Sequence, residues 1–252
     1  IYAMFPGSLI KRVNAPSTRF TIEYDDGFRA HYREAELGAG AMIKATDLPL
    51  SWIRDDAFIH IAPMNPPKVR KLVERIRRAS KGAKVSINSN ITYMSSARNR
   101  RILLELAKEA DLFVVDDREA MALSGASSLT QALRLIEAKR LAVTLGQIGA
   151  IFVEGGDVRM VPALSGAVPT PKDTTGAGDT WCGSLIAAYS ICGDWLKSVV
   201  AACIISALKC MSWGFERIRG LRFNGPDEAI EYVLSLRDGS GQLSLKNFLE
   251  AE

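Results

Sequence analysis

Residues 173–180 of the chain have the sequence Asp-Thr-Thr-Gly-Ala-Gly-Asp-Thr, and the interpretation of the whole chain starts from this stretch. The residues that follow are small and apolar, which predicts a closely packed helix over residues 177–192. The Gly-Ala-Gly segment then lies at the helix N-terminus, where backbone N–H groups lack intrahelical partners and the macrodipole is positive. Such a terminus suits an anion, and glycine lets the backbone approach a phosphate closely.

Asp179 follows these glycines directly. A carboxylate at that position does not neutralise a phosphate, but it is well placed to accept a proton from a hydroxyl that attacks the phosphate. The structural alternative is that Asp179 only favours the first turn of a helix and that the glycines form a tight turn. The spacing leaves both interpretations open.

Composition is typical of a soluble globular protein with a real core: of 252 residues, 48% are hydrophobic and 24% charged. The net charge of +4 is spread along the chain, apart from basic clusters at residues 75–78 and 98–101. Both clusters fall in predicted helices with interleaved apolar residues, so we interpret them as solvated helix faces and expect no nucleic-acid partner.

The sequence also predicts a cytoplasmic protein with no membrane partner. The longest apolar run, residues 199–208, is too short to span a bilayer, and no signal-peptide pattern is present. Four cysteines at positions 182, 192, 203 and 210 have no metal-ligand spacing and lie in apolar helical contexts. We expect them to be reduced core residues.

A β-hairpin is predicted near the start of the chain. Apolar residues alternate on either side of the turn signal Asp25-Asp26-Gly27, with Phe20, Ile22 and Tyr24 before it. The pattern gives the hairpin one apolar face, which needs cover, and a homodimer through this hairpin is one way to supply it.

From about residue 57, strand patterns alternate with helix patterns, which predicts an α/β fold with a mainly parallel sheet and helices on both faces. The expected strands are residues 57–62, 83–87, 111–115 and 140–145, followed by a hairpin of residues 150–153 and 158–161. The expected helices are residues 66–80, 96–109, 118–123, 129–138, 177–192, 195–212 and 226–237.

Ligands of such sheets bind beyond the carboxyl ends of the strands, and two strand ends there carry suggestive residues. Asp116 and Glu119 follow a buried strand and suit Mg²⁺, although the residues by themselves favour a helix cap. The segment from Thr144 to Gly149 suits a nucleotide or an ordinary strand–turn–strand connection. Asn88 and Asn90 are either ligand contacts or turn formers, and we favour turn formers.

Residues 173–179 resemble the signature of the ribokinase-like (PfkB-type) carbohydrate kinases, Asp-Thr-x-Gly-Ala-Gly-Asp. The resemblance implies that Asp179 is the catalytic base and that the backbone N–H groups of Gly176, Ala177 and Gly178 form an anion hole. In some family members the first Asp and the second Thr of this signature bind a monovalent cation, which makes Asp173 and Thr175 candidate ligands.

The resemblance extends to the other loops. The family carries Asn-x-x-Glu after the third strand, where this chain has Asp116 but keeps Glu119. The implied nucleotide contacts are Thr144, Gly146, Gly149, Thr174 and Cys203. The family's first strand, with its substrate-binding Asp, and the Gly-Gly…Asn segment are not visible before the hairpin, so we expect the N-terminal part of the family fold to be absent.

The family resemblance implies a single ribokinase-like kinase domain over residues 1–252, with a small β lid at about 16–45 and an α/β core at 46–252. It implies transfer of the γ-phosphoryl group of ATP to a hydroxyl of a sugar, polyol or nucleoside, with Mg²⁺ and with K⁺ as a further candidate. The alternative hypothesis is a catalytically impaired nucleotide-binding regulatory or assembly module of the same fold. A P-loop kinase is disfavoured, because no Gly-x₄-Gly-Lys-Ser/Thr occurs.

Overall fold

The computed structural model describes residues 12–26, 30–164 and 171–235. Contacts divide the chain into two compact units, residues 1–48 and 49–252. The strands are β1 (Arg19–Tyr24), β2 (Ala30–Glu36), β3 (Phe58–Ile61), β4 (Lys84–Asn88), β5 (Leu112–Asp116), β6 (Arg140–Thr144), β7 (Gly149–Glu154) and β8 (Asp157–Pro162). The α-helices are α1 (Pro66–Ala79), α2 (Ala97–Glu109), α3 (Asp117–Ser124), α4 (Leu129–Leu135), α5 (Ala177–Cys192), α6 (Trp195–Cys210), α7 (Glu216–Arg219) and α8 (Pro226–Ser235).

In the first unit, β1 and β2 form the predicted antiparallel hairpin, with one irregularity that the alternation did not predict. Thr21 pairs with Glu34 while Ile22 pairs with Tyr32, so one residue of β2 is extra. This bulge keeps Tyr32 and Ala35 on one face although they are three residues apart. The rings of Phe20 and Tyr32 meet edge to face on that face, with centroids 5.8 Å apart. Gly27 of the predicted turn lies outside the described residues.

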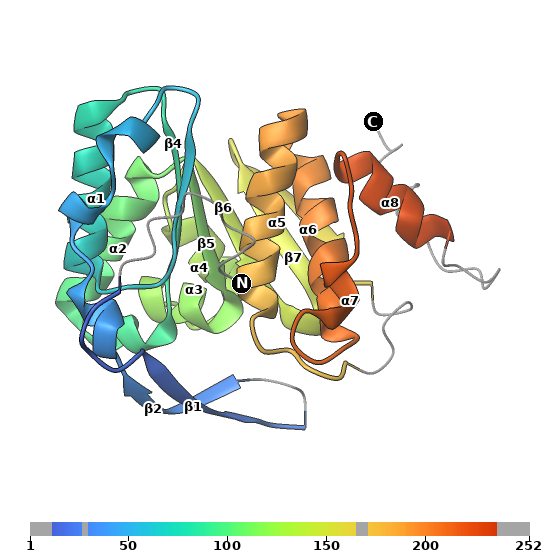
Figure 1. Ribbon diagram of the computed structural model, residues 1–252, viewed down its shortest axis with the longest axis horizontal. Helices are drawn as coiled ribbons and strands as arrows, with labels where there is room; N and C mark the ends of the chain where they lie inside the picture. Colours follow the sequence, from blue (N-terminus) through green and yellow to red (C-terminus); the bar gives the residue numbers. More distant parts are fainter. Residues whose placement is uncertain (1–11, 27–29, 165–170, 236–252) are drawn as a thin grey trace. The chain divides into compact units, whose positions relative to one another are not determined.

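The second unit is built on a six-stranded sheet with the order β3-β4-β5-β6-β7-β8. Strands β3 to β6 are parallel to one another, whereas β7 is antiparallel to β6 and β8 is antiparallel to β7. Parallel strands are buried on both faces, and β5 accordingly has four consecutive buried residues, at 112–115. The mainly parallel sheet with a terminal hairpin is therefore confirmed (Figure 1).

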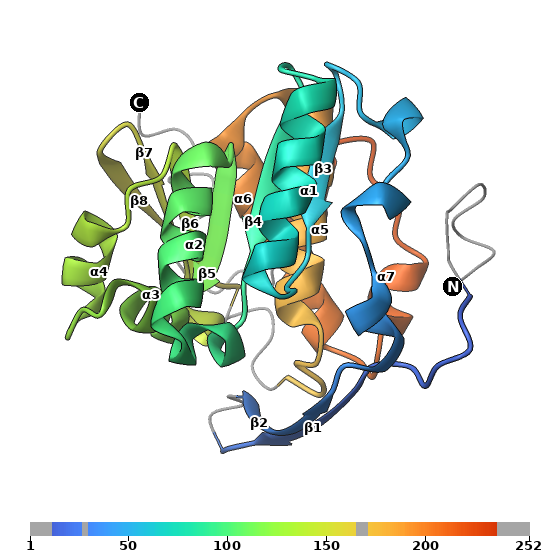
Figure 2. The ribbon, with the colours of Figure 1, turned by 90° about the vertical axis from the view of Figure 1, so that its left-hand side faces the viewer.

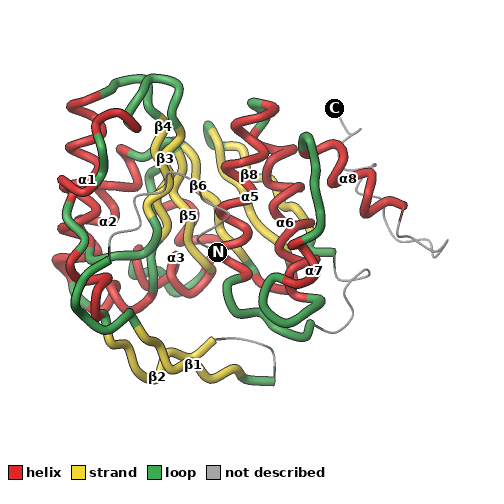
Figure 3. The backbone as a smooth tube through the Cα atoms, in the orientation of Figure 1, coloured by secondary structure: helices red, strands yellow, loops and turns green. Residues whose placement is uncertain are grey.

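Helices cover both faces of this sheet, as predicted. In Figure 2, α1 and α2 lie in front of the sheet, and α5 and α6 lie behind it. Leu112 and Val114 of β5 pack with Leu185 of α5 and Ile204 of α6 in one buried core. Figure 3 shows the same layers, with the strands between two groups of helices. The layers place the N-terminus of α5 beside the sheet.

Some boundaries and environments differ from the predictions. Helix α4 ends at Leu135 rather than at residue 138, because Ile136 has an extended backbone and a buried side chain. The four-residue helix α7 was not predicted. All four cysteines are free, but Cys192 is exposed, so the prediction that all four are core residues is wrong for that one. Among the described residues, no helix combines the length and apolar character needed to cross a membrane.

Candidate functional site

Polar side chains collect at the carboxyl ends of the parallel strands. His60, Asn88, Asp116 and Thr144 stand at or next to the ends of β3, β4, β5 and β6, and Asp116 lies opposite Thr144 in the β5–β6 register. The N-terminus of α5 lies in the same region: Asp179 is close enough to His60 for its charge to raise the pKa of the imidazole, and Asp179 and Glu119 both raise the pKa of Cys182. The structure therefore brings the first turn of α5 close to the carboxyl ends of β3 and β4 and to the start of α3.

Gly176 caps α5 in the left-handed conformation, with φ of 75° and ψ of 11°, which favours glycine. Ala177, Gly178 and Asp179 form the first turn of the helix. The N–H of Ala177 donates to the carbonyl oxygen of Thr174 at 3.0 Å, so this amide already closes a turn. Within the described part of the chain, the N–H groups of Gly176 and Gly178 make no such bond. The N–H of Asp179 likewise makes no backbone bond among the described residues.

Asp179 is exposed at the third position of α5. The charge of Asp179 raises the pKa of both the imidazole of His60 and the thiol of Cys182, so both groups lie near it. Burial raises the pKa of Cys182 to about 12, with Asp179 and Glu119 adding to the shift. The thiol therefore stays protonated and does not act as a nucleophile.

Next to Asp179, His60 and Asn88 form a small polar group. The Nδ1 atom of His60 lies 2.6 Å from Oγ of Ser86, and burial lowers the pKa of His60 below its usual range, although Asp179 and Asn88 oppose this shift. Asn88 stands close to the imidazole, but its Oδ1 atom is buried without completing a hydrogen bond to any described residue, as is Oγ of Ser89. Buried polar atoms are seldom left unpaired, so these two atoms suit a polar ligand.

The two candidate asparagines thus differ. Asn90 caps a short 3₁₀ turn by accepting from the N–H and hydroxyl of Thr92, which confirms the turn-forming interpretation for that residue. Asn88, at the last position of β4, has no such partner. His60 was not among the predicted site residues. Its place one residue before the end of a strand that leads into a helix is the signal that could have marked it.

Asp116 and Glu119 form a capping box at the start of α3. Oδ1 of Asp116 accepts from the N–H of Glu119 at 2.7 Å, and Oε2 of Glu119 accepts from the N–H of Asp116 at 2.9 Å. Burial and the neighbouring Asp116 raise the pKa of Glu119 to about 8 despite these hydrogen bonds. The cap therefore accounts for the pattern, while one oxygen of each carboxylate stays outside the capping box. Two carboxylates suit Mg²⁺, which is commonly held by one or two carboxylates together with substrate phosphates and water.

The candidate nucleotide loop follows β6. Thr144 ends this strand half-buried, and Gly146 begins a 3₁₀ turn with φ of 57° and open space around it. Gly149 is different: a Cβ there would lie 2.0 Å from the carbonyl oxygen of Val161. Pairing of β7 with β8 is therefore sufficient to explain Gly149. Thr174, the other loop residue, contributes its carbonyl to the turn at Ala177.

Cys203 does not suit the nucleotide contact that the resemblance implied. Its side chain is only 6% exposed and lies in the core between α5 and α6. Its Sγ atom accepts from Nε1 of Trp181 at 3.3 Å, and burial raises the pKa of the thiol to about 11. Helix α6 is apolar on nearly all sides, so its sequence could not show which face points to a ligand.

Asp173 and Thr175 lie together, but their surroundings do not suit a bound monovalent cation. Oδ1 of Asp173 accepts from the N–H of Thr175 at 2.9 Å, while Oδ2 lies 3.1 Å from the ammonium of Lys209. Lys209 was not among the predicted residues. A lysine in the last turn of a helix is usually solvated, whereas this one is fully buried.

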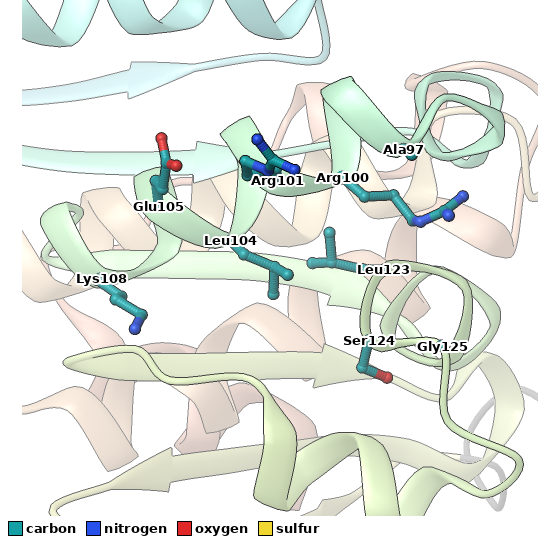
Figure 4. A pocket seen from close by; sticks show the side chains of 9 residues that line it. All are labelled: Ala97, Arg100, Arg101, Leu104, Glu105, Lys108, Leu123, Ser124 and Gly125. Atoms are coloured by element: carbon teal, nitrogen blue, oxygen red, sulfur yellow. The ribbon is translucent and has the colours of Figure 1, made fainter.

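A separate groove of about 460 Å³ runs between α2 and the end of α3, far along the chain from the signature (Figure 4). Leu104 and Leu123 point toward one another at its base. Its charged groups have partners elsewhere: Arg100 donates to the carbonyl of Met94, and Lys108 pairs with Glu137. None of the predicted site residues lines it, so the groove does not change the candidate site.

Comparisons with known proteins agree with this arrangement. The family model described as pfkB family carbohydrate kinase matches residues 29–215. A cytidine kinase of Thermococcus kodakarensis is 31% identical over 159 residues, which are 62% of this chain and 55% of that protein. A fructokinase of Vibrio alginolyticus is 25% identical over 205 residues, 78% of this chain and 66% of its own. The chain thus spans between about half and two thirds of these relatives.

Solved structures show the same fold at low sequence identity. An adenosine kinase from Sinorhizobium meliloti superposes with a TM-score of 0.70 at 20% identity, covering 86% of this chain and 66% of that one. A ribokinase from Thermotoga maritima gives 0.66 at 19% identity, covering 89% and 72%. The match of the family model over most of the chain, together with this fold, shows that the chain belongs to the pfkB family of carbohydrate kinases.

Proposed function

We propose that the protein is an ATP-dependent kinase that transfers the γ-phosphoryl group to a hydroxyl of a sugar, polyol or nucleoside. The observation that carries the proposal is the first turn of α5. There an exposed carboxylate, Asp179, directly follows backbone amides of Gly176 and Gly178 that have no partner within the described residues. A base beside an anion-binding turn matches the needs of phosphoryl transfer, which depends on positioning and charge stabilisation.

In this mechanism, Asp179 accepts the proton of the acceptor hydroxyl as the hydroxyl oxygen attacks the γ-phosphorus, while the bond from that phosphorus to the β,γ-bridging oxygen breaks and ADP leaves. The amides of Gly176 and Gly178, aided by the positive end of α5, stabilise charge on the transferred group. His60 and Asn88 present polar atoms beside Asp179 and orient the acceptor. Thr144, Gly146 and Thr174 line the nucleotide side, and Gly149 holds that loop in place.

Asp116 and Glu119 are the residues that would hold Mg²⁺, which supplies positive charge to the phosphates when it is bound. Oδ2 of Asp116 takes no part in the capping box, whereas Glu119 also accepts a backbone hydrogen bond from Ile91. Their positions at the end of β5 and the start of α3 keep them next to Thr144 in the neighbouring strand.

The test is turnover of ATP with a panel of acceptors chosen from the relatives: cytidine, adenosine, ribose and fructose. Asp179→Asn should lower turnover by about 10²–10⁴, as loss of a general base does, and leave nucleotide affinity within a few-fold. Asp227→Asn is the matched control, because Asp227 also lies in the first turn of a helix, at α8, and pairs with Lys197. It should keep full turnover.

Two results would overturn parts of the proposal. Near-normal turnover in Asp179→Asn removes the assigned base. Nucleotide binding without acceptor-dependent ATP consumption, across a broad acceptor screen, favours the alternative of a nucleotide-binding regulatory or assembly module.

A further inference from the structure

A fully buried lysine sits beside the loop that leads into α5. Lys209 lies in the last turn of α6, and its side chain has no exposed surface. Its Nζ atom donates to the backbone carbonyl of Asp173 at 2.8 Å and lies 3.1 Å from the carboxylate Oδ2 of the same residue. The ring of Phe215 faces the ammonium at 5.9 Å. A buried ammonium is costly unless it is paired and hydrogen-bonded. Here Asp173 supplies both the ion pair and a hydrogen bond, and the ring of Phe215 lies on another side of the ammonium.

The carboxylate of Asp173 is held from several directions. Besides Lys209, the N–H of Thr175 donates to Oδ1 at 2.9 Å and the N–H of Gly214 donates to Oδ2 at 2.9 Å. Together these contacts tie the loop before Gly176 to the end of α6.

A potassium ion binds backbone carbonyl and carboxylate oxygens, and Asp173 offers one of each. Both of these oxygens are already within 3.1 Å of a positive nitrogen. A second cation on the same oxygens would meet the charge of Lys209 at short range in a buried setting, where repulsion is strong. The residues present thus do not fit a monovalent cation at this position.

We infer that the ammonium of Lys209 takes the place of a monovalent cation at Asp173, so that the loop is ordered by a side chain of the protein itself and needs no K⁺. The carbonyl that Lys209 holds lies three residues before Gly176, whose left-handed backbone starts α5. Fixing this carbonyl fixes the direction of the amides that follow. The claim that the ammonium of Lys209 occupies the cation position at Asp173 does not depend on the kinase reaction. The claim that turnover needs no K⁺ rests on the proposed function.

The first experiment uses the unaltered protein in KCl and in tetramethylammonium chloride at equal ionic strength. We expect the thermal midpoint to agree within about 1 °C and the affinity for a non-hydrolysable ATP analogue to agree within about two-fold. Crystals soaked in rubidium chloride should show no anomalous peak in contact with Asp173. A rubidium peak there, or a K⁺-specific gain of about five-fold or more in affinity, overturns the inference.

The second experiment removes the charge. Lys209→Met keeps much of the side-chain length, removes the cationic partner of Asp173 and should lower the thermal midpoint strongly in tetramethylammonium. K⁺ should then restore part of the loss, because the freed oxygens can bind it. Lys172→Met is the control, since Lys172 is exposed on the same loop, and it should show neither effect. A folded Lys209→Met protein that ignores K⁺ contradicts the substitution of one cation by the other.

These readouts separate the inference from the proposed function. If no acceptor supports turnover but the melting, binding and rubidium experiments give the expected results, the kinase proposal fails. The inference that Lys209 replaces a monovalent cation at Asp173 is then still supported. If turnover is found and rises about five-fold or more with K⁺ in the unaltered protein, the kinase proposal stands and the inference fails. A Lys209→Met variant that does not fold leaves the decision to the unaltered protein.

Discussion

At the scale of single residues, the most informative side chain near Asp179 is one whose role the sequence did not reveal. His60 is half-buried one residue before the end of β3, and its Nδ1 atom lies 2.6 Å from Oγ of Ser86. Burial lowers the pKa of His60, because the charged ring is poorly solvated there. The folded protein therefore favours the neutral imidazole more than the unfolded chain does.

This difference predicts a stability change with pH. As pH falls below the ordinary value of 6.5, the unfolded chain binds a proton at residue 60 before the folded protein does, so the free energy of unfolding decreases. Glu119, whose pKa is raised to about 8, acts in the opposite sense over this range, so the effect of His60 is measured as a difference between two proteins. In urea unfolding, lowering the pH from about 7 to about 5 should cost the unaltered protein unfolding free energy relative to His60→Gln. His31→Gln is the control, because His31 is partly exposed beside Asp25 in the hairpin. An unchanged slope in His60→Gln would refute the assignment.

The residues that could be predicted are those whose chemistry is carried by local sequence. Asp179 and the glycines before it stand in one short motif, and the capping box of Asp116 and Glu119 needs only a spacing of three. Asn88 and Lys209 could not be predicted, because their environments are set by distant segments. Whether an asparagine oxygen is left unpaired, or a lysine is buried, depends on what packs around it.

At the scale of elements, two substitutions of Asp116 at the start of α3 distinguish its role as a helix cap from the effect of its charge. Asp116→Ala removes the acceptor for the N–H of Glu119 and should cost about 1 kcal/mol of unfolding free energy. Asp116→Asn keeps a good cap and should stay within about 0.5 kcal/mol of the unaltered protein. Urea unfolding curves of the two variants measure the difference. Equal destabilisation by both changes would mean that the charge of Asp116, and not its cap, matters for stability.

The glycines around the turn from β6 to β7 give a second prediction at this scale. A Cβ at Gly149 would meet backbone atoms of Val161, Pro162 and Ala163, so Gly149→Ala should cost about 3 kcal/mol from backbone strain and overpacking. Gly146 also has a positive φ, but nothing lies within 4 Å of its Cβ position, and Gly146→Ala should cost about 1 kcal/mol. Similar losses in chemical denaturation would contradict this assignment of Gly149 to strand packing.

Elements were predicted well where their hydrophobic periodicity follows from packing against one neighbouring layer. Helix α5 has the predicted bounds, and the strands of the sheet agree within one or two residues. The bulge in β2 and the early end of α4 were not predicted. Both depend on which face a side chain must bury, as with Ile136, and not on local propensity.

At the scale of the whole molecule, the first unit leaves apolar side chains to be covered. Phe20, Tyr24 and Tyr32 are each 39% exposed or more. Contiguous exposed apolar surface commonly marks an interaction site, and a second copy of the hairpin presents the same surface. We therefore expect the protein to self-associate through this face, in line with the homodimer that the alternating sequence pattern suggests.

Phe20→Lys should weaken this association, because it places a charge on the apolar face beside Tyr32. Thr21→Lys adds the same charge to the opposite face, across from Glu34, and should leave the association intact. Light scattering over a range of protein concentrations distinguishes the two variants. Since the substitutions lie in the hairpin and the core of the second unit is built from other residues, both should keep the unfolding free energy of that core. A protein that stays monomeric at every concentration rules out the hairpin as a dimer contact.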